Sequence, residues 1–286
     1  EQEVASVDVI KQPLDQFVAQ LNSNKEEIIN SVLGGLRDQN LKDDQIEIKP
    51  TTVAVSALRP TQNEVVFDSS IPFALKRPKV FMEYYKSNGP FKVGPAGNDA
   101  IVTLDEKFVL DGHHRWSSLY CVNPRASMHT FDIKAPVSPI NMLKLMQASI
   151  KAYAGKIPSN KGGGVNLFTI DRKTLQDEVR KLLNRDLVQE YMQLGLLRDV
   201  NEDVETGRAQ RSLRLVYRKL MDIYGTNVAL MQSKNKPVSG ASSRESMPQT
   251  DAPAGSKVSA GGDTPAALQP LEKGQVDFRS PFSTKS

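Results

Sequence analysis

The feature that most constrains the fold is a short run in which an apolar strand passes through a glycine into a helix. Residues 108–110 are apolar, Asp111 and Gly112 interrupt them, and helical character begins at His113. Glycine lets the backbone turn without a steric penalty. Two of the three histidines and the single tryptophan of the chain fall within residues 111–116. The run therefore predicts a tight strand, turn and helix unit with polar side chains gathered at the turn.

The chemistry of this turn favours an anion such as phosphate. A helix start presents unpaired N–H groups and a partial positive charge. Arg115 can hold an oxyanion through two N–H groups, and a histidine can donate to phosphate or transfer protons near neutral pH. The alternative is that one histidine and Trp116 pack in the core while Asp111 caps the helix. The expected phosphate- or nucleotide-binding residues are Asp111, Gly112, His113, His114, Arg115 and Gln62.

Hydrophobic patterning divides the 286 residues into four zones. Residues 1–44 predict a helical N-terminal arm, and residues 45–135 predict a small mixed α/β unit of short strands, turns and helices. Residues 136–232 predict a helical region, in which Thr174 is the expected N-cap of one helix. Residues 233–286 are rich in Ser, Pro, Gly, Ala and Lys without hydrophobic periodicity, which predicts an extended or disordered tail. The tail residues expected to anchor it on another subunit are Val276, Phe278, Pro281 and Phe282.

The string FVLDGHHRWSSLY resembles the signature of the ParB/sulfiredoxin-like superfamily, in which a strand, a G-x-x-R turn and a helix bind phosphates. Upstream, ALRPTQ at residues 57–62 resembles the box that opens ParB-type domains. The resemblance covers about residues 48–135 and implies an α+β fold, with a ParB/sulfiredoxin-like domain between the helical arm and the helical region. The DGHHRW form is similar to that of phage-encoded relatives and of free-serine kinases.

Departures from the family pattern narrow the implied activities. Sulfiredoxins have a nucleophilic cysteine where this chain has His113, and Cys121 lies about two helical turns away. ParB nucleotidases have two arginines at the turn, whereas this chain has one. The serine kinases have a carboxylate base in the upstream box, where this chain has Gln62, and an amide does not accept a proton at neutral pH. Glu64 or Asp68 is a candidate substitute.

Two functions follow as hypotheses. In the first, the chain is a phage virion or assembly-associated protein that retains the anion pocket and binds neighbouring subunits through its extended tail. In the second, it is a serine-kinase-like phosphotransferase or a ParB-like nuclease acting at the turn, with Glu64 and His113 as catalytic residues and a nucleotide with magnesium as a possible cofactor. The first hypothesis places the protein in a virion or in the host cytoplasm, with other virion or assembly proteins as partners.

Other features of the sequence indicate a function less specifically than the turn does. A basic face on one predicted helix, which allows nucleic-acid binding, comprises Arg208, Arg211, Arg214 and Arg218. The net charge of +4 is too small to indicate nucleic acid by itself. The three glycines at 162–164 lack the spacing of a phosphate-binding loop and predict a linker. No metal site is expected, no apolar run approaches the length of a membrane span, and residues 1–6 contain no secretory signal.

Overall fold

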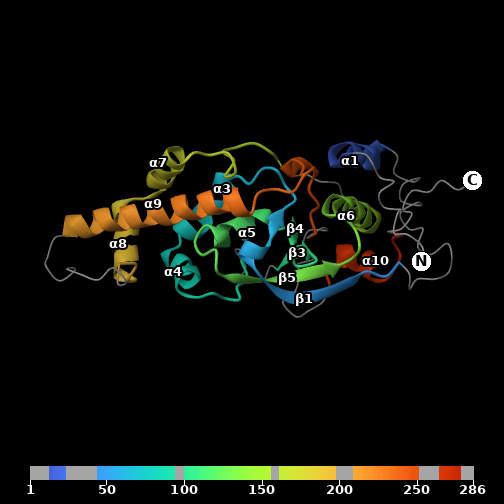
Figure 1. The fold of residues 1–286 in the computed structure, drawn as a ribbon, viewed down its shortest axis with the longest axis horizontal. Coiled ribbons are helices and arrows are strands. Elements are labelled where there is room, and N and C mark those ends of the chain that lie inside the picture. Colours follow the sequence, from blue (N-terminus) through green and yellow to red (C-terminus); the bar gives the residue numbers. More distant parts are fainter. Residues whose placement is uncertain are drawn as a thin grey trace, which may run out of the picture.

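The computed structural model describes residues 13–23, 44–93, 100–155, 161–197, 209–250 and 264–277. These residues form a five-stranded mixed sheet with helices on both faces (Figure 1), so the α+β prediction is confirmed. The strands are β1 (Glu47–Ala54), β2 (Arg59–Pro60), β3 (Ile101–Leu104), β4 (Phe108–Asp111) and β5 (Ser127–Lys134). The helices are α1 (Leu14–Ser23), α3 (Phe67–Leu75), α4 (Pro78–Lys86), α5 (His113–Tyr120), α6 (Pro139–Ala154), α7 (Arg172–Leu182), α8 (Arg185–Gln193), α9 (Ala209–Lys234) and α10 (Gln269–Glu272).

The sheet has the strand order β1-β5-β3-β4-β2. β3 and β4 form an antiparallel hairpin, β5 runs parallel to β3, and β1 closes one edge antiparallel to β5. The short β2 runs parallel to β4 at the other edge. This order places the end of β4, and therefore the turn into α5, next to the segment that follows β2.

Two hydrophobic cores lie on opposite faces of the sheet. The first contains α3, α4, α5 and the long helix α9 with α7 and α8, and its largest buried side chains include Trp116, Phe81, Tyr191 and Tyr224. The second contains α1, α6 and α10 against the other face, with Phe131 buried beneath them. The predicted helical region at 136–232 therefore contributes α6 to one face and α7 to α9 to the other, without forming a core of its own.

The described part of the predicted tail packs on the body of the same chain. Met247, Leu268, Leu271 and Val276 are all buried in the second core. They are too widely spaced in the sequence to show a period, yet each is buried in the same core as α1 and α6. The expectation that Val276 anchors on another subunit is therefore corrected, because this chain already buries it. The other expected anchors, Phe278, Pro281 and Phe282, lie outside the described residues.

Local differences from the sequence predictions have local causes. The N-terminal arm is described only as α1, and residues 24–43 lie outside the description. The predicted N-cap at Thr174 is wrong: the Asp171 carboxylate accepts hydrogen bonds from the Thr174 N–H at 2.9 Å and from its hydroxyl at 2.7 Å, so the helix begins earlier. None of the helices within the described ranges combines the length and apolar character needed to cross a membrane.

Candidate functional site

Gly112 makes the turn from β4 into α5 possible. Its backbone has φ +97° and ψ 29°, in the left-handed region that glycine favours. A Cβ at this position would lie 2.4 Å from Cγ2 of Ile101, which is far inside van der Waals contact. The terminal nitrogen of Arg115 lies 3.1 Å from the same point. A close turn therefore brings the first residues of α5 against β3, with an arginine folded back over the glycine.

His113 occupies a buried position beneath this turn. Only 4% of the residue is exposed, and its Nε2 accepts a hydrogen bond of 3.0 Å from the Thr61 N–H. Burial, followed by the proximity of His114, lowers the pKa of His113 to about 3. The ring is therefore neutral at physiological pH, and its Nε2 is occupied by the backbone. This geometry favours a structural role over the proton transfer expected from the sequence.

His114 has the same function for the next part of the chain. Its Nε2 accepts a hydrogen bond of 3.2 Å from the Val66 N–H. Burial lowers its pKa to about 4, with a smaller contribution from the positive charge of Arg244. Through these two hydrogen bonds, His113 and His114 hold residues 61–66 against the start of α5. We call this pair of contacts the histidine latch.

The charged residues of the turn are also bonded within the chain. The Asp111 carboxylate accepts from the Thr250 N–H at 3.1 Å and from its hydroxyl at 2.5 Å. Arg115 Nη1 donates to the Ala100 carbonyl at 3.2 Å. Asp111 is thus held by a residue from the predicted tail, 139 positions later in the sequence. Asp111 does not cap the helix. Gly112 is the N-cap, and no side-chain hydrogen bond caps this end of α5.

Gln62 and Glu64 lie in the segment that the latch fastens. Gln62 is 3% exposed, and its side-chain amide donates to the Glu64 carbonyl. Oε1 of Glu64 accepts from the Gly163 N–H at 3.0 Å, so the predicted linker at 162–164 contacts the site. Asp68 lies exposed in the first turn of α3. Glu64 keeps a partly exposed carboxylate at the site.

The structure therefore brings together all six residues expected to bind phosphate, around the start of α5. The basic face lies elsewhere, on α9, where Arg214 and Arg218 are exposed. Arg211 belongs to α9, but its side chain lies outside the description, and so does the whole of Arg208. Within the described ranges, no three His, Cys, Asp or Glu side chains cluster so as to hold a metal ion.

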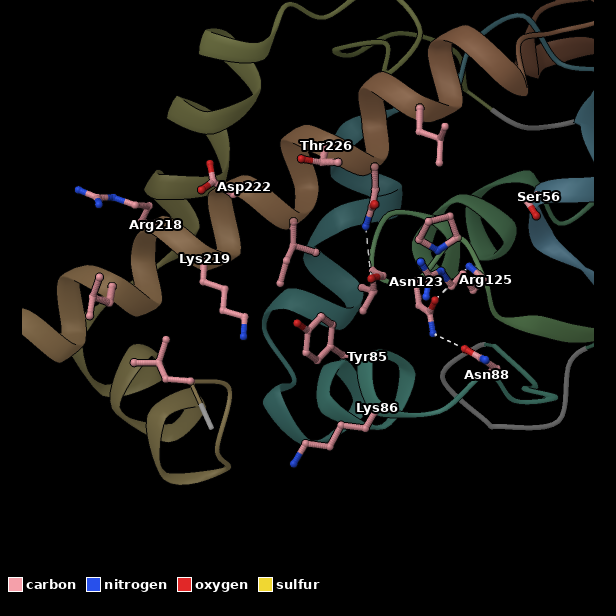
Figure 2. A pocket seen from close by; sticks show the side chains of 17 residues that line it. Ser56, Tyr85, Lys86, Asn88, Asn123, Arg125, Arg218, Lys219, Asp222 and Thr226 are labelled. Carbon is pink, nitrogen blue, oxygen red and sulfur yellow. Dashed lines mark hydrogen bonds between the residues drawn. The ribbon is translucent and has the colours of Figure 1, made fainter. Parts of the chain in front are cut away.

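The sequence interpretation missed a groove of about 1250 Å³ between α9, α4 and the connection from α5 to β5 (Figure 2). The residues of α9 that line the groove form a single stripe from Leu215 to Leu230. The spacing of three and four residues along this stripe is the signal that could have indicated it. Which elements face the stripe depends on tertiary packing, which the local pattern does not encode.

Compared with known proteins, the chain matches no protein-family model, no curated protein and no solved structure.

Proposed function

We propose that this chain is a phage virion or assembly-associated protein built on a ParB/sulfiredoxin-like domain, in which the DGHHR turn is structural. One observation carries the proposal: the polar side chains of the turn are bonded within the chain. His113 and His114 are neutral acceptors of backbone N–H groups, and Asp111 accepts from Thr250. A phosphotransfer site needs such groups directed at the substrate and its developing charge.

The family assignment within this proposal rests on the motif. It is supported by the order of a buried strand, a left-handed glycine and a helix at β4, Gly112 and α5. It is also supported by residues 57–62, which resemble the box that opens ParB-type domains and contact the turn through the hydrogen bond from the Thr61 N–H to His113.

The assembly role is supported by how the C-terminal zone binds. Residues 236–242 run along the edge of β2, where the Val238 N–H donates to the Pro60 carbonyl at 3.0 Å and the Asn63 N–H donates to the Ser242 carbonyl at 2.9 Å. An extended segment that binds through many backbone contacts is a common way of joining subunits. We propose that the chain uses contacts of this kind with neighbouring virion or assembly proteins as well.

The second candidate is a phosphotransferase or nuclease that uses a nucleotide with magnesium. Arg115 favours it, because the guanidinium lies beside Gly112 at the start of α5, where a phosphate would meet free N–H groups. Glu64 supplies a nearby carboxylate. For this activity the hydrogen bonds from Thr250 to the Asp111 carboxylate would have to break.

The test combines nucleotide binding with particle association. The purified chain is mixed with millimolar ATP, ADP or CTP and magnesium, and its melting temperature and nucleotide turnover are measured beside Arg115→Ala and His114→Ala. We expect no turnover and no rise in melting temperature, since a bound ligand would raise it by mass action. In a density gradient of source material, an antibody should find the chain with a large particle.

Turnover that is lost in Arg115→Ala would contradict the structural role and establish the enzyme. A protein that sediments only as a free monomer in source material would contradict the assembly role.

A further inference from the structure

The groove between α9 and α4 is built as a binding surface of its own. α9 lines it from Leu215 to Leu230, a length of about 22 Å at 1.5 Å per residue. The opposite wall comes from Tyr85 in α4 and from residues 122–125 after α5. Figure 2 shows Lys219 pointing from α9 into the space between the helices, with Arg125 at the far end. Such a length suits an elongated ligand better than a small molecule.

Aliphatic side chains form much of the groove, beside uncharged polar ones such as Asn123, Thr226 and Asn227. Its lining includes Val122, Leu197, Ile223 and Leu230, of which Val122 and Leu197 are buried. At the rim Leu215 is 45% exposed, one of the three large hydrophobic side chains that stand out among the described residues. Apolar surface rimmed by polar residues is typical of interaction sites.

The charges on the groove are mostly positive. Lys86, Arg125, Arg218 and Lys219 line it together with Asp222, the one acidic lining residue in the described part of the chain. Asp222 lies 3.5 Å from Arg172, which offsets its charge. Neither Arg125 nor Arg218 forms an ion pair with another described residue. The groove therefore favours an acidic partner.

The two lysines have partners that leave their charge in place. Lys219 donates to the Leu196 carbonyl at 2.6 Å, and Lys86 donates to the Leu194 carbonyl at 3.3 Å, so both bind carbonyl groups just after α8. Carbonyl groups carry no net charge, so these hydrogen bonds do not offset the charge that the lysines bring to the groove. These contacts hold the two cations at the wall of the groove.

Aliphatic walls distinguish between the two acidic classes of partner. Single-stranded nucleic acid binds by stacking its bases on exposed aromatic faces. The described lining offers one aromatic side chain, Tyr85, and Lys219 Nζ already lies 5.4 Å from the centre of its ring. Aliphatic side chains on an amphipathic helix, in contrast, match a groove of leucine, isoleucine and valine.

We infer that the groove between α9 and α4 binds an acidic amphipathic helix of a partner protein, with aliphatic residues on the groove side and carboxylates toward Arg125 and Arg218. The groove would bind this partner whether or not the chain is a virion protein.

The probe is a labelled synthetic helix of 16 residues with leucines on one face and glutamates on the other, measured by fluorescence anisotropy on the full chain. A peptide with lysine in place of glutamate and a single-stranded oligonucleotide are measured beside it. We expect saturable binding of the acidic peptide only. The double variant Arg125→Glu/Arg218→Glu should weaken it at least tenfold, and Leu215→Ser should weaken it several-fold.

Arg214→Glu is compared with Arg218→Glu alone, which changes the charge by the same amount, because Arg214 is exposed on the same helix but does not line the groove. Equal weakening by Arg214→Glu would overturn the inference, since the effect would then come from overall charge. Tighter binding of the oligonucleotide, lost in the same double variant, would assign the groove to nucleic acid instead. The sequence between α8 and α9 contains the acidic residues Glu202, Asp203 and Glu205. Peptide binding that occurs only after these three are neutralised would overturn the inference of a partner protein, because the chain itself would then supply the acidic occupant.

Discussion

At the scale of single residues, the two histidines of the turn are acceptors for the backbone. Histidine at this kind of position could serve catalysis, because its ordinary pKa lies near neutrality. Burial removes that property here by lowering the pKa of His113 to about 3 and of His114 to about 4. The same side chains that suggest chemistry in the sequence then join two distant parts of the backbone.

The depressed pKa values predict that stability falls on mild acidification. In the unfolded chain both histidines bind protons near pH 6.5, whereas in the folded chain they stay neutral until about pH 4 and pH 3. Stability is therefore complete above pH 6.5 and is lost as the pH falls below it. When the pH is lowered from 7 to 5, each histidine should reduce the free energy of unfolding by about 2 kcal/mol. Urea unfolding at the two pH values measures this loss.

A variant and a control assign that loss to the latch. His114→Gln should remove about half of the difference between pH 7 and pH 5, because one titrating group is gone. His129→Gln in β5 is the control and should leave the difference in place, because His129 lies outside the latch. Equal free energies of unfolding at both pH values in the unaltered chain would show that the histidines are not held neutral.

At the scale of elements, the end of α9 is fixed to the sheet by one buried amide. The side-chain nitrogen of Asn235 donates to the Ser56 and Leu58 carbonyls, both at 2.8 Å. Its oxygen accepts from the Tyr120 hydroxyl at 2.7 Å. Asn235 is 3% exposed. One residue thus joins α9, α5 and the segment after β1 at the point where the chain leaves the helix for the β2 edge.

Replacing this amide should destabilise the fold well beyond the effect of its volume. Asn235→Ala leaves two carbonyls and one hydroxyl without their partner in a buried site, at a cost of about 2 to 4 kcal/mol. The free energy of unfolding by denaturant is the measurement. Ser233→Ala, on the exposed side of the last turn of α9, is the control and should change it by less than about 0.5 kcal/mol. Similar effects of the two variants would contradict the bracing role of Asn235.

At the scale of the whole molecule, the second core is completed by residues from far along the sequence. Leu268, Leu271 and Val276 are fully buried in the second core, which also contains α1 and α6. The Ile46 N–H donates to the Leu271 carbonyl at 3.2 Å, so the segment also contacts the start of β1.

A chain that ends at residue 263 should therefore be less stable and should expose apolar surface that the full chain buries. Each buried apolar side chain contributes roughly 1.5 to 3 kcal/mol, and the truncation removes three of them from the α6 face. We expect a lower melting temperature and increased binding of a hydrophobic dye. The full-length variant Leu271→Asp should reproduce both effects without shortening the chain. An unchanged melting temperature in both would mean that the segment does not complete the core.

The sequence predicted the features that depend on consecutive residues. It missed the contacts between residues that lie far apart in the sequence. The turn at Gly112 was predictable because a strand, a glycine and a helix are consecutive there. The bond between Asp111 and Thr250 was not, because a serine- and proline-rich segment carries no local sign of where it packs. Thr174 was misassigned as a cap because Asp171, three residues earlier, is the better acceptor for its N–H group. The ParB-like interpretation and the assembly role remain predictions.

The contacts of the second core have a consequence for synthesis on the ribosome. The first face of the sheet needs nothing beyond α9 and can close while translation continues. The second face must wait for the codons of Leu268, Leu271 and Val276, although its first helix, α1, was made some 250 residues earlier. Until then the nascent chain carries an open apolar face on α6, which is the kind of surface that chaperones bind. A chain whose translation stops before residue 264 would lack the side chains that complete this face of the sheet.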